Sequence, residues 1–200
     1  MRWLDVLIIF TLTFAAYMAR LRAPYVADDH FVFYRLQQGG MFGFASQPPT
    51  NFFRPLISLH YYLDYWLGMS PLFSHAVNLG WHIGVALLLY VFGYHLLLRW
   101  NWDPGSARRG SFAGALLFAV LPANVEAVAW FAARADMVAT SAAIGALLLL
   151  MRFQQRGEVT SYLGALGCSA AGLFCKESLL TFPFIVWLWL RTLGVARAGR

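Results

Sequence analysis

Ionisable and polar side chains that could do chemistry are gathered in a few short stretches of a chain that is otherwise apolar. The carboxylates could accept a proton as general bases, the cations could bind an anion, and carboxylates with imidazoles could hold a hard metal ion. Taken singly, each group also has a structural explanation, such as a helix cap, an interfacial ion pair or a packing residue. The candidates are Asp28, Asp29, Arg54, His75, Asn78, His82, Glu126, Arg134, Asp136, Lys176 and Glu177.

Composition places these residues in a membrane protein. Hydrophobic residues make up 60% of the chain and charged residues 12%, whereas soluble domains are about 25% charged. The mean hydropathy is +0.59. The arginines are scattered between apolar segments and form no basic face, so the net charge of +6 does not predict nucleic-acid binding. The sequence therefore predicts an all-α, multi-pass integral membrane protein with a single transmembrane domain over 1–200.

The apolar segments predict about six transmembrane helices. The first is expected to be a retained helix and not a signal peptide, because an acid follows its start at Asp5. The fifth segment is short, and if it does not cross, the sixth lies on the other side. The predicted spans are 3–19, 76–98, 111–125, 135–151, 162–175 and 179–193.

The segments between the spans are more polar. The first outer loop, 20–75, is too polar to cross a bilayer, but it contains helix-like pieces over 28–38 and 54–68 that we expect to lie along the membrane surface. Polar loops are expected over 101–110 and 152–161.

Charge distribution orients the spans and gathers the candidates. With the N-terminus inside, the inner side carries the whole excess of +6, as the positive-inside tendency requires. All the candidate residues then fall on the outer side, and positions 75, 78 and 82 share one helical face. Ionisable groups at membrane depth are costly and usually line a functional cavity, so their shared side predicts one site.

The order of motifs resembles the N-terminal half of GT-C membrane glycosyltransferases. It is most similar to the transmembrane and tetratricopeptide-repeat O-mannosyltransferase group and its bacterial relatives. The resemblance covers about 20–190, and the VEAVAWFAARAD stretch is its most specific part. The motifs are the Asp pair at 28–29, FRPL (53–56), HAVNLGWH (75–82), LPANVEAVAWFAARADMVA (121–139) and CKES (175–178).

The resemblance implies an inverting transferase that takes a sugar, with mannose as the first candidate, from a polyprenyl phosphate to a protein or glycan acceptor. Asp28 and Asp29 would be catalytic, and Arg134, Lys176 and Arg54 would bind the donor phosphate. The remaining candidates would orient these groups: Glu126, Asp136, Glu177, His75, Asn78 and His82.

The sequence leaves a metal ion and an alternative function open. A divalent metal ion could be held at Asp28, Asp29 and His75, because some relatives use a metal and others do not. The expected location is a bacterial inner membrane, with a periplasmic or extracellular active face. The alternative function is a non-catalytic membrane protein, either a transporter of lipid-linked glycans or an assembly subunit. Family members usually have more spans and added helical repeats, so the sequence also predicts a fragment, a split protein or a minimal relative.

Overall fold

The computed structural model describes residues 2–26, 28–42, 53–68 and 70–194, and within these ranges it is helical, with no β-strand. Short 3-10 turns join several of the α-helices. The turns are η1 (Met18–Arg22), η2 (Gly40–Phe42), η3 (Pro122–Asn124), η4 (Phe131–Ala133) and η5 (Glu177–Thr181). The helices are α1 (Trp3–Tyr17), α2 (Asp28–Gly39), α3 (Pro55–Trp66), α4 (Pro71–Arg99), α5 (Pro104–Val120), α6 (Val125–Ala129), α7 (Arg134–Arg156), α8 (Val159–Cys175) and α9 (Phe182–Gly194).

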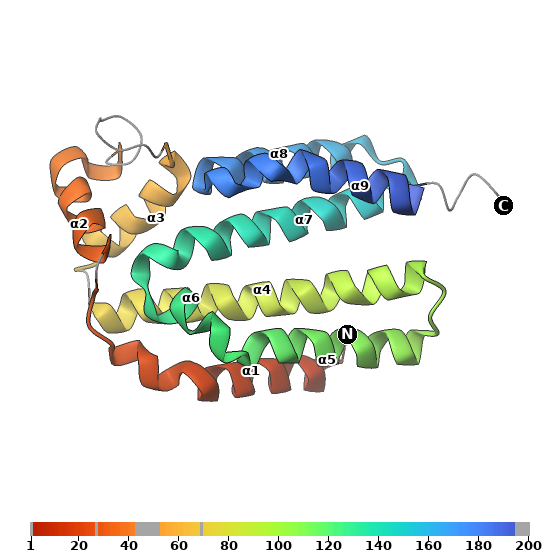
Figure 1. Cartoon of the computed structure of the whole chain (residues 1–200), viewed down its shortest axis with the longest axis horizontal. Coiled ribbons are helices and arrows are strands. Elements are labelled where there is room, and N and C mark those ends of the chain that lie inside the picture. Colours follow the sequence, from red (N-terminus) through yellow and green to blue (C-terminus); the bar gives the residue numbers. More distant parts are fainter. Residues whose placement is uncertain (1, 27, 43–52, 69, 195–200) are drawn as a thin grey trace.

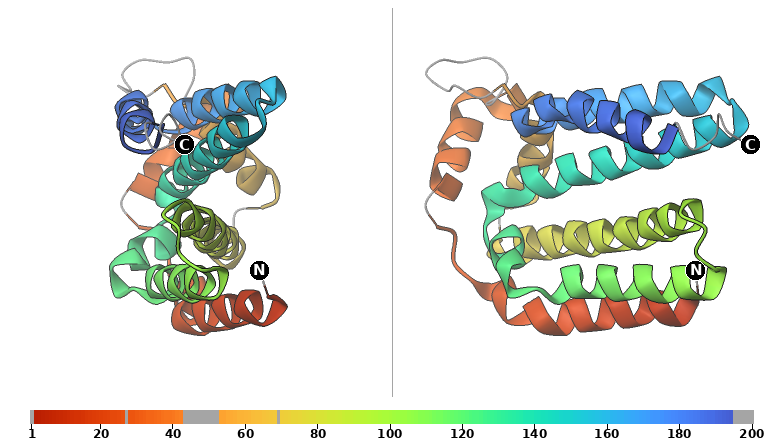
Figure 2. Two further views of the ribbon diagram at one scale, coloured as in Figure 1. Left: turned by 90° about the vertical axis from the view of Figure 1, so that its right-hand side faces the viewer. Right: turned by 45° about the vertical axis from the view of Figure 1, so that its right-hand side comes forward.

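The long helices lie side by side and alternate in direction along the chain (Figure 1). Helices α1, α4 and α5 form one group and α7, α8 and α9 another, and α4 packs against α7 between them (Figures 1 and 2). Helices α2, α3 and α6 lie together at one end of this bundle, which we call the capped end (Figure 1). The connections from α4 to α5 and from α7 to α8 lie at the opposite end.

Three helical stretches are long and apolar enough to cross a membrane, so the chain is an integral membrane protein. They are Trp3–Arg22, Pro71–Arg99 and Phe131–Arg156. The pair Pro104–Val120 and Pro122–Ala129, bent by 53°, would make a fourth if it counts as one span. Helix α8 is apolar but shorter, so the six-span topology stays a prediction.

Two loop predictions are wrong at their boundaries. The loop expected over 101–110 is largely helical, because Asp103 caps α5 by accepting hydrogen bonds from the backbone N–H groups of Gly105 and Ser106, both at 3.0 Å. The helix that contains the start of the third predicted span, 111–125, therefore begins at Pro104, and its straight part ends at Val120.

The loop expected over 152–161 is also shorter than predicted. Helix α7 continues to Arg156 and ends at Gly157, whose φ of 68° is a left-handed conformation that glycine adopts without strain. Helix α8 then begins at Val159. By contrast, α2 and α3 correspond closely to the helices expected over 28–38 and 54–68.

A buried apolar cluster fixes the two helices of the outer loop at the capped end. Leu36 of α2 and Ile57 of α3 are both almost fully buried, and they pack with Phe131 of η4. Ala135 and Val138 extend the same cluster into α7, and Cys175 extends it to the end of α8. Segments far apart in the sequence are thus held together by burial of apolar surface.

The opposite end of the bundle has its own buried polar contact, which involves the acid of the first span. Tyr90 donates a hydrogen bond of 2.5 Å to the Asp5 carboxylate, and Arg108 donates to both of its oxygens at 2.8 Å. These bonds tie α1 to α4 and α5, and they balance the charge of Asp5.

Candidate active site at the capped end

The stretches that carry the candidate residues meet at the capped end. Arg54 donates to both carboxylate oxygens of Glu177, with an Nε–Oε2 distance of 2.8 Å. The Lys176 ammonium bonds the Asp136 carboxylate, and the Asp29 carboxylate accepts a hydrogen bond from the backbone of Ala132. The outer loop, the segment between α5 and α7, and the turn between α8 and α9 are therefore joined directly.

The two acids predicted to be catalytic have different surroundings. Asp29 is completely buried. Its Oδ2 accepts a hydrogen bond from the backbone N–H of Val26 and its Oδ1 from that of Ala132, each at 3.0 Å. Asp28 is exposed at the start of α2. Asp29 thus fastens the start of α2 to η4, and this contact fixes the backbone that presents Asp28.

Arg134 is the largest fully buried side chain in the described part of the chain. Its Nη1 and Nη2 donate to the two oxygens of Asp64 at 2.8 and 2.7 Å, and Nη2 also donates to the Ser74 carbonyl at 3.0 Å. The guanidinium carbon lies 4.9 Å from the centre of the Phe131 ring. The guanidinium expected to bind a donor phosphate thus faces a buried carboxylate in this structure, and the phosphate-binding role of Arg134 stays a prediction.

The polar residues predicted to share one face of the second span are all buried on α4. Asn78 links two segments, since its Oδ1 accepts from Arg134 Nε at 2.8 Å and its Nδ2 donates to the Trp130 carbonyl at 2.9 Å. His75 and His82 each place Nε2 near a backbone carbonyl, that of Ala23 at 3.1 Å and that of Ala119 at 2.9 Å. Because a carbonyl only accepts, these Nε2 atoms carry the proton, and the histidines hold neighbouring segments in place.

Two ion pairs lie nearer the surface. In the pair of Arg54 with Glu177, the side chains are 17% and 47% exposed, and in that of Lys176 with Asp136 they are 24% and 54% exposed. The hydrogen bonds from Arg54 lower the pKa of Glu177 below its ordinary value. Such pairs contribute little to stability individually, but they balance the charges of both cations.

The described residues do not fit the metal site that was left open. No group of three or more His, Cys, Asp and Glu side chains in the described ranges is arranged to hold a metal ion. Asp29 has both oxygens bonded to backbone N–H groups, and His75 directs Nε2 at a carbonyl. With Asp28 at the exposed start of α2, these three residues do not form a ligand set.

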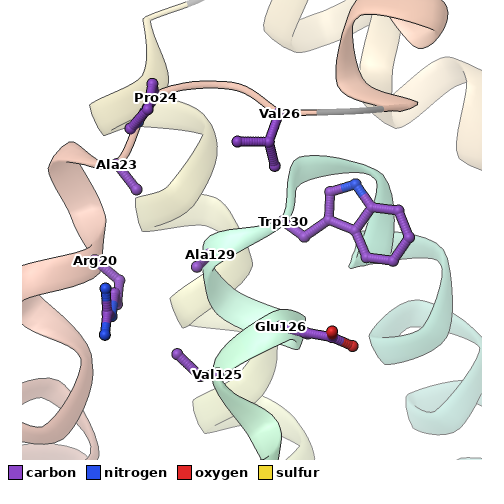
Figure 3. A pocket seen from close by; sticks show the side chains of 8 residues that line it. All are labelled: Arg20, Ala23, Pro24, Val26, Val125, Glu126, Ala129 and Trp130. Carbon is purple, nitrogen blue, oxygen red and sulfur yellow. The ribbon is translucent and has the colours of Figure 1, made fainter.

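A pocket of about 510 Å³ lies between η1, the segment that follows it and the segment around α6 (Figure 3). Arg20 lines it from η1, and Glu126 and Trp130 line it from the segment around α6. Figure 3 shows the indole ring of Trp130 beside the Glu126 carboxylate, with Arg20 on the other side of α6. The remaining lining residues are apolar: Ala23, Pro24, Val26, Val125 and Ala129.

Comparison with known proteins shows which family the chain resembles. The chain is 30% identical to protein O-mannosyl-transferase Tmtc1 of Drosophila melanogaster over 189 residues, which is 85% of this chain and 21% of that protein. It is 35% identical to protein O-mannosyl-transferase TMTC1 of Mus musculus over 75% of this chain, and 35% identical to Tmtc2 of Drosophila melanogaster over 64% of it. The resemblance to the O-mannosyltransferase group is confirmed.

The chain spans about a fifth or less of the length of these O-mannosyl-transferases. No family model matches the chain, and no solved structure matches it.

Sequence reasoning missed residues that complete the capped end of this O-mannosyl-transferase relative. Asp64, the partner of Arg134, is not among the candidates, although a single acid on an aromatic helix is a signal for a buried ion pair. Tyr61 donates to the Ala132 carbonyl at 2.7 Å, and Tyr25 shares a hydrogen bond of 2.9 Å with Ser74. Arg20 is also not among the candidates, and nothing in its spacing predicts the pocket.

Proposed function

We propose that this chain carries the catalytic base, a carboxylate, of a membrane glycosyltransferase that moves a sugar from a polyprenyl phosphate to an acceptor hydroxyl at the capped end. Mannose is the first candidate for the sugar and a protein for the acceptor, because the relatives are named protein O-mannosyl-transferases. The observation that carries the proposal is the arrangement of the acidic pair. Asp29 is bound to two backbone N–H groups, one of them from Val26, which lines a pocket, and the neighbouring Asp28 is exposed at the start of α2.

The chemistry needs one base. The acceptor hydroxyl oxygen attacks the anomeric carbon of the donor sugar while the bond from that carbon to the phosphate oxygen breaks. The proton of the hydroxyl goes to the Asp28 carboxylate, and the lipid phosphate leaves with the bonding electrons. A single displacement of this kind inverts the configuration of the anomeric carbon. Asp29 acts as a positioning residue for the backbone of Asp28.

The proposed active face is the one away from the cytoplasm. Arginines near the end of α4, the start of α5 and the end of α7 gather at the opposite end of the bundle: Arg99, Arg108, Arg109, Arg152 and Arg156. Cytoplasmic loops are enriched in such residues, which would place the capped end outside the cytoplasm. The expected bacterial inner membrane gains no support, since the similar O-mannosyl-transferases come from fly, mouse and human.

Replacement of the exposed acid tests this function. We expect Asp28→Asn to lower transfer from polyprenyl-phosphate mannose by about 100-fold or more, because a general base typically contributes 10²–10⁴-fold. Asp29→Asn should also lower transfer, but with a loss of thermal stability that Asp28→Asn lacks. The measurement is sugar transfer by the full protein in membranes, with and without chelator, for several polyprenyl-phosphate sugars.

Glu158→Gln is the matched control, because Glu158 is a carboxylate that forms ion pairs at the opposite end of the bundle. It should leave transfer unchanged. If Asp28→Asn inserts normally and transfers at the wild-type rate, the catalytic proposal is lost. The non-catalytic alternative, a transporter or an assembly subunit, would then take its place.

A further inference from the structure

The cations that the sequence nominated for phosphate binding all face carboxylates. Arg134 is paired with Asp64 inside the protein, and Arg54 is paired with Glu177. Lys176 is bonded to Asp136. A phosphate group is bound most strongly by a cation whose charge is not already balanced by a neighbouring acid. None of these three meets that condition, so the phosphate of a donor needs another partner.

Arg20 meets the condition. It is exposed in η1, and within the described ranges it takes part in no ion pair. Its side chain lines the pocket of about 510 Å³ at the end of the first membrane-spanning stretch, Trp3–Arg22. A guanidinium at this depth can meet the phosphate of a lipid whose tail stays in the bilayer.

The other residues that line the pocket suit the two groups that such a phosphate joins, the polyprenyl chain and the sugar. Five of the eight lining residues are small or branched apolar residues, which can contact the first isoprene units of a polyprenyl chain. Across α6 from Arg20, the Trp130 ring offers a flat surface to a sugar, and the Glu126 carboxylate offers acceptors for its hydroxyl groups. The volume lies within the range of small-molecule sites, about 300–1,000 Å³.

The pocket also lies next to the acidic pair. Val26 is one of its walls, and the backbone N–H of the same residue donates to Asp29 at 3.0 Å. A sugar held against Trp130 would therefore be close to the start of α2, where Asp28 is exposed. The donor and the proposed base would be brought together by one short segment of the chain.

We infer that this pocket binds the phosphate and the first isoprene units of a polyprenyl-phosphate sugar, with Arg20 as the phosphate ligand. The inference rests on the proposed function for the identity of the donor, and it assigns that donor to a site that the sequence did not indicate. Arg20→Ala should weaken binding of polyprenyl-phosphate mannose about 10- to 100-fold, the usual effect of losing a charge-assisted hydrogen bond. Arg20→Lys, which keeps the charge, should recover part of the loss.

Arg22→Ala is the matched control. Arg22 is exposed in the same 3-10 turn and has the same charge, but it does not line the pocket. We would measure equilibrium binding of radiolabelled polyprenyl-phosphate mannose to the full protein in lipid nanodiscs and expect Arg22→Ala to match the wild type within about twofold. Unlabelled polyprenyl phosphate should compete, whereas mannose 1-phosphate and inorganic phosphate should compete far more weakly.

The outcomes separate this inference from the proposed function. Wild-type affinity in Arg20→Ala, or equal losses in both arginine variants, would overturn the pocket assignment and leave the transferase proposal standing. Effective competition by mannose 1-phosphate would overturn the lipid part of the assignment, and so would a wild-type protein that binds no polyprenyl-phosphate mannose. Binding that depends on Arg20 without any sugar transfer would support the pocket and contradict the transferase proposal.

Discussion

At the scale of single residues, most of the polar side chains at the capped end hold the structure together. Asp29 bonds two backbone N–H groups, and Asn78 bridges Arg134 to the Trp130 carbonyl. Arg134 also donates to both oxygens of Asp64 and to a backbone carbonyl. Buried polar groups are stable only when they are paired in this way. Asp28, Arg20 and Glu126 are exposed in the described part of this end, and they are the groups that we propose face the substrates.

The buried pair of Arg134 and Asp64 gives a stability prediction. Asp64→Asn should destabilise the protein by about 3–5 kcal/mol, because it leaves the Arg134 charge buried and unbalanced. Thermal unfolding of the purified protein in detergent measures the effect. The double variant Asp64→Leu with Arg134→Met should be closer to the wild type than Asp64→Asn is, since an apolar pair removes both charges. A double variant that is less stable than Asp64→Asn would contradict the explanation that the unbalanced charge of Arg134 causes the loss.

At the scale of elements, the sequence predicted the helices better than their ends. The pieces expected over 28–38 and 54–68 match α2 and α3, because capping residues and an early proline marked their starts. The start of α5 was not predicted, because a polar stretch such as the one after Asp103 also fits a loop. In the structure, Asp103 and Pro104 form the start of the helix. Hydrophobicity finds apolar segments, but caps decide where the helices begin.

The candidate site, like the helices, could be predicted only in part. The gathering of the acidic and basic stretches at one end of the bundle could be inferred from the order of the spans. Which carboxylate meets which cation could not, because Arg134 with Asp64 and Arg54 with Glu177 are 70 and 123 residues apart. Such pairings depend on how α3 and η5 pack against the bundle, and spacing along one helix does not encode that packing.

The contact between Arg54 and Glu177 gives a pH prediction at this scale, because it connects the start of α3 to η5. The pKa of Glu177 is lowered from its ordinary value of 4.5, mainly by Arg54. The ionised pair therefore adds stability above pH 4.5, and that stability is lost as the pH falls through the lower pKa of the folded protein. Since Glu177 is 47% exposed, its loss should cost under about 1 kcal/mol.

Unfolding midpoints of the wild type and Glu177→Gln between pH 7 and pH 3 would check this. The unfolding midpoints of the two proteins should differ slightly at pH 7 and become equal as the pH falls to 3. Glu126→Gln is the control, because Glu126 is exposed at the same end and forms no ion pair within the described residues. A difference between the unfolding midpoints of the wild type and Glu177→Gln that grows as the pH falls would contradict the prediction.

At the scale of the whole molecule, the alternating direction of the helices determines which candidate residues lie at the same end of the bundle. Helices α1, α5 and α8 run toward the capped end, and α4, α7 and α9 run away from it (Figure 1). The turns after α1, α5 and α8 therefore share one end, and they carry the acidic pair, Glu126 and the Lys176–Glu177 dipeptide. If α8 and α9 both cross the bilayer, all of these residues face the same compartment.

Sided labelling of single cysteines in intact cells or vesicles tests this arrangement most directly, in a background that lacks Cys168 and Cys175. We predict that cysteines at positions 28 and 176 react with a membrane-impermeant reagent from the non-cytoplasmic side. A cysteine at position 156, at the opposite end of α7, should react only after the membrane is permeabilised. Labelling of positions 28 and 176 from opposite sides would contradict the common site, and with it the proposed sugar transfer.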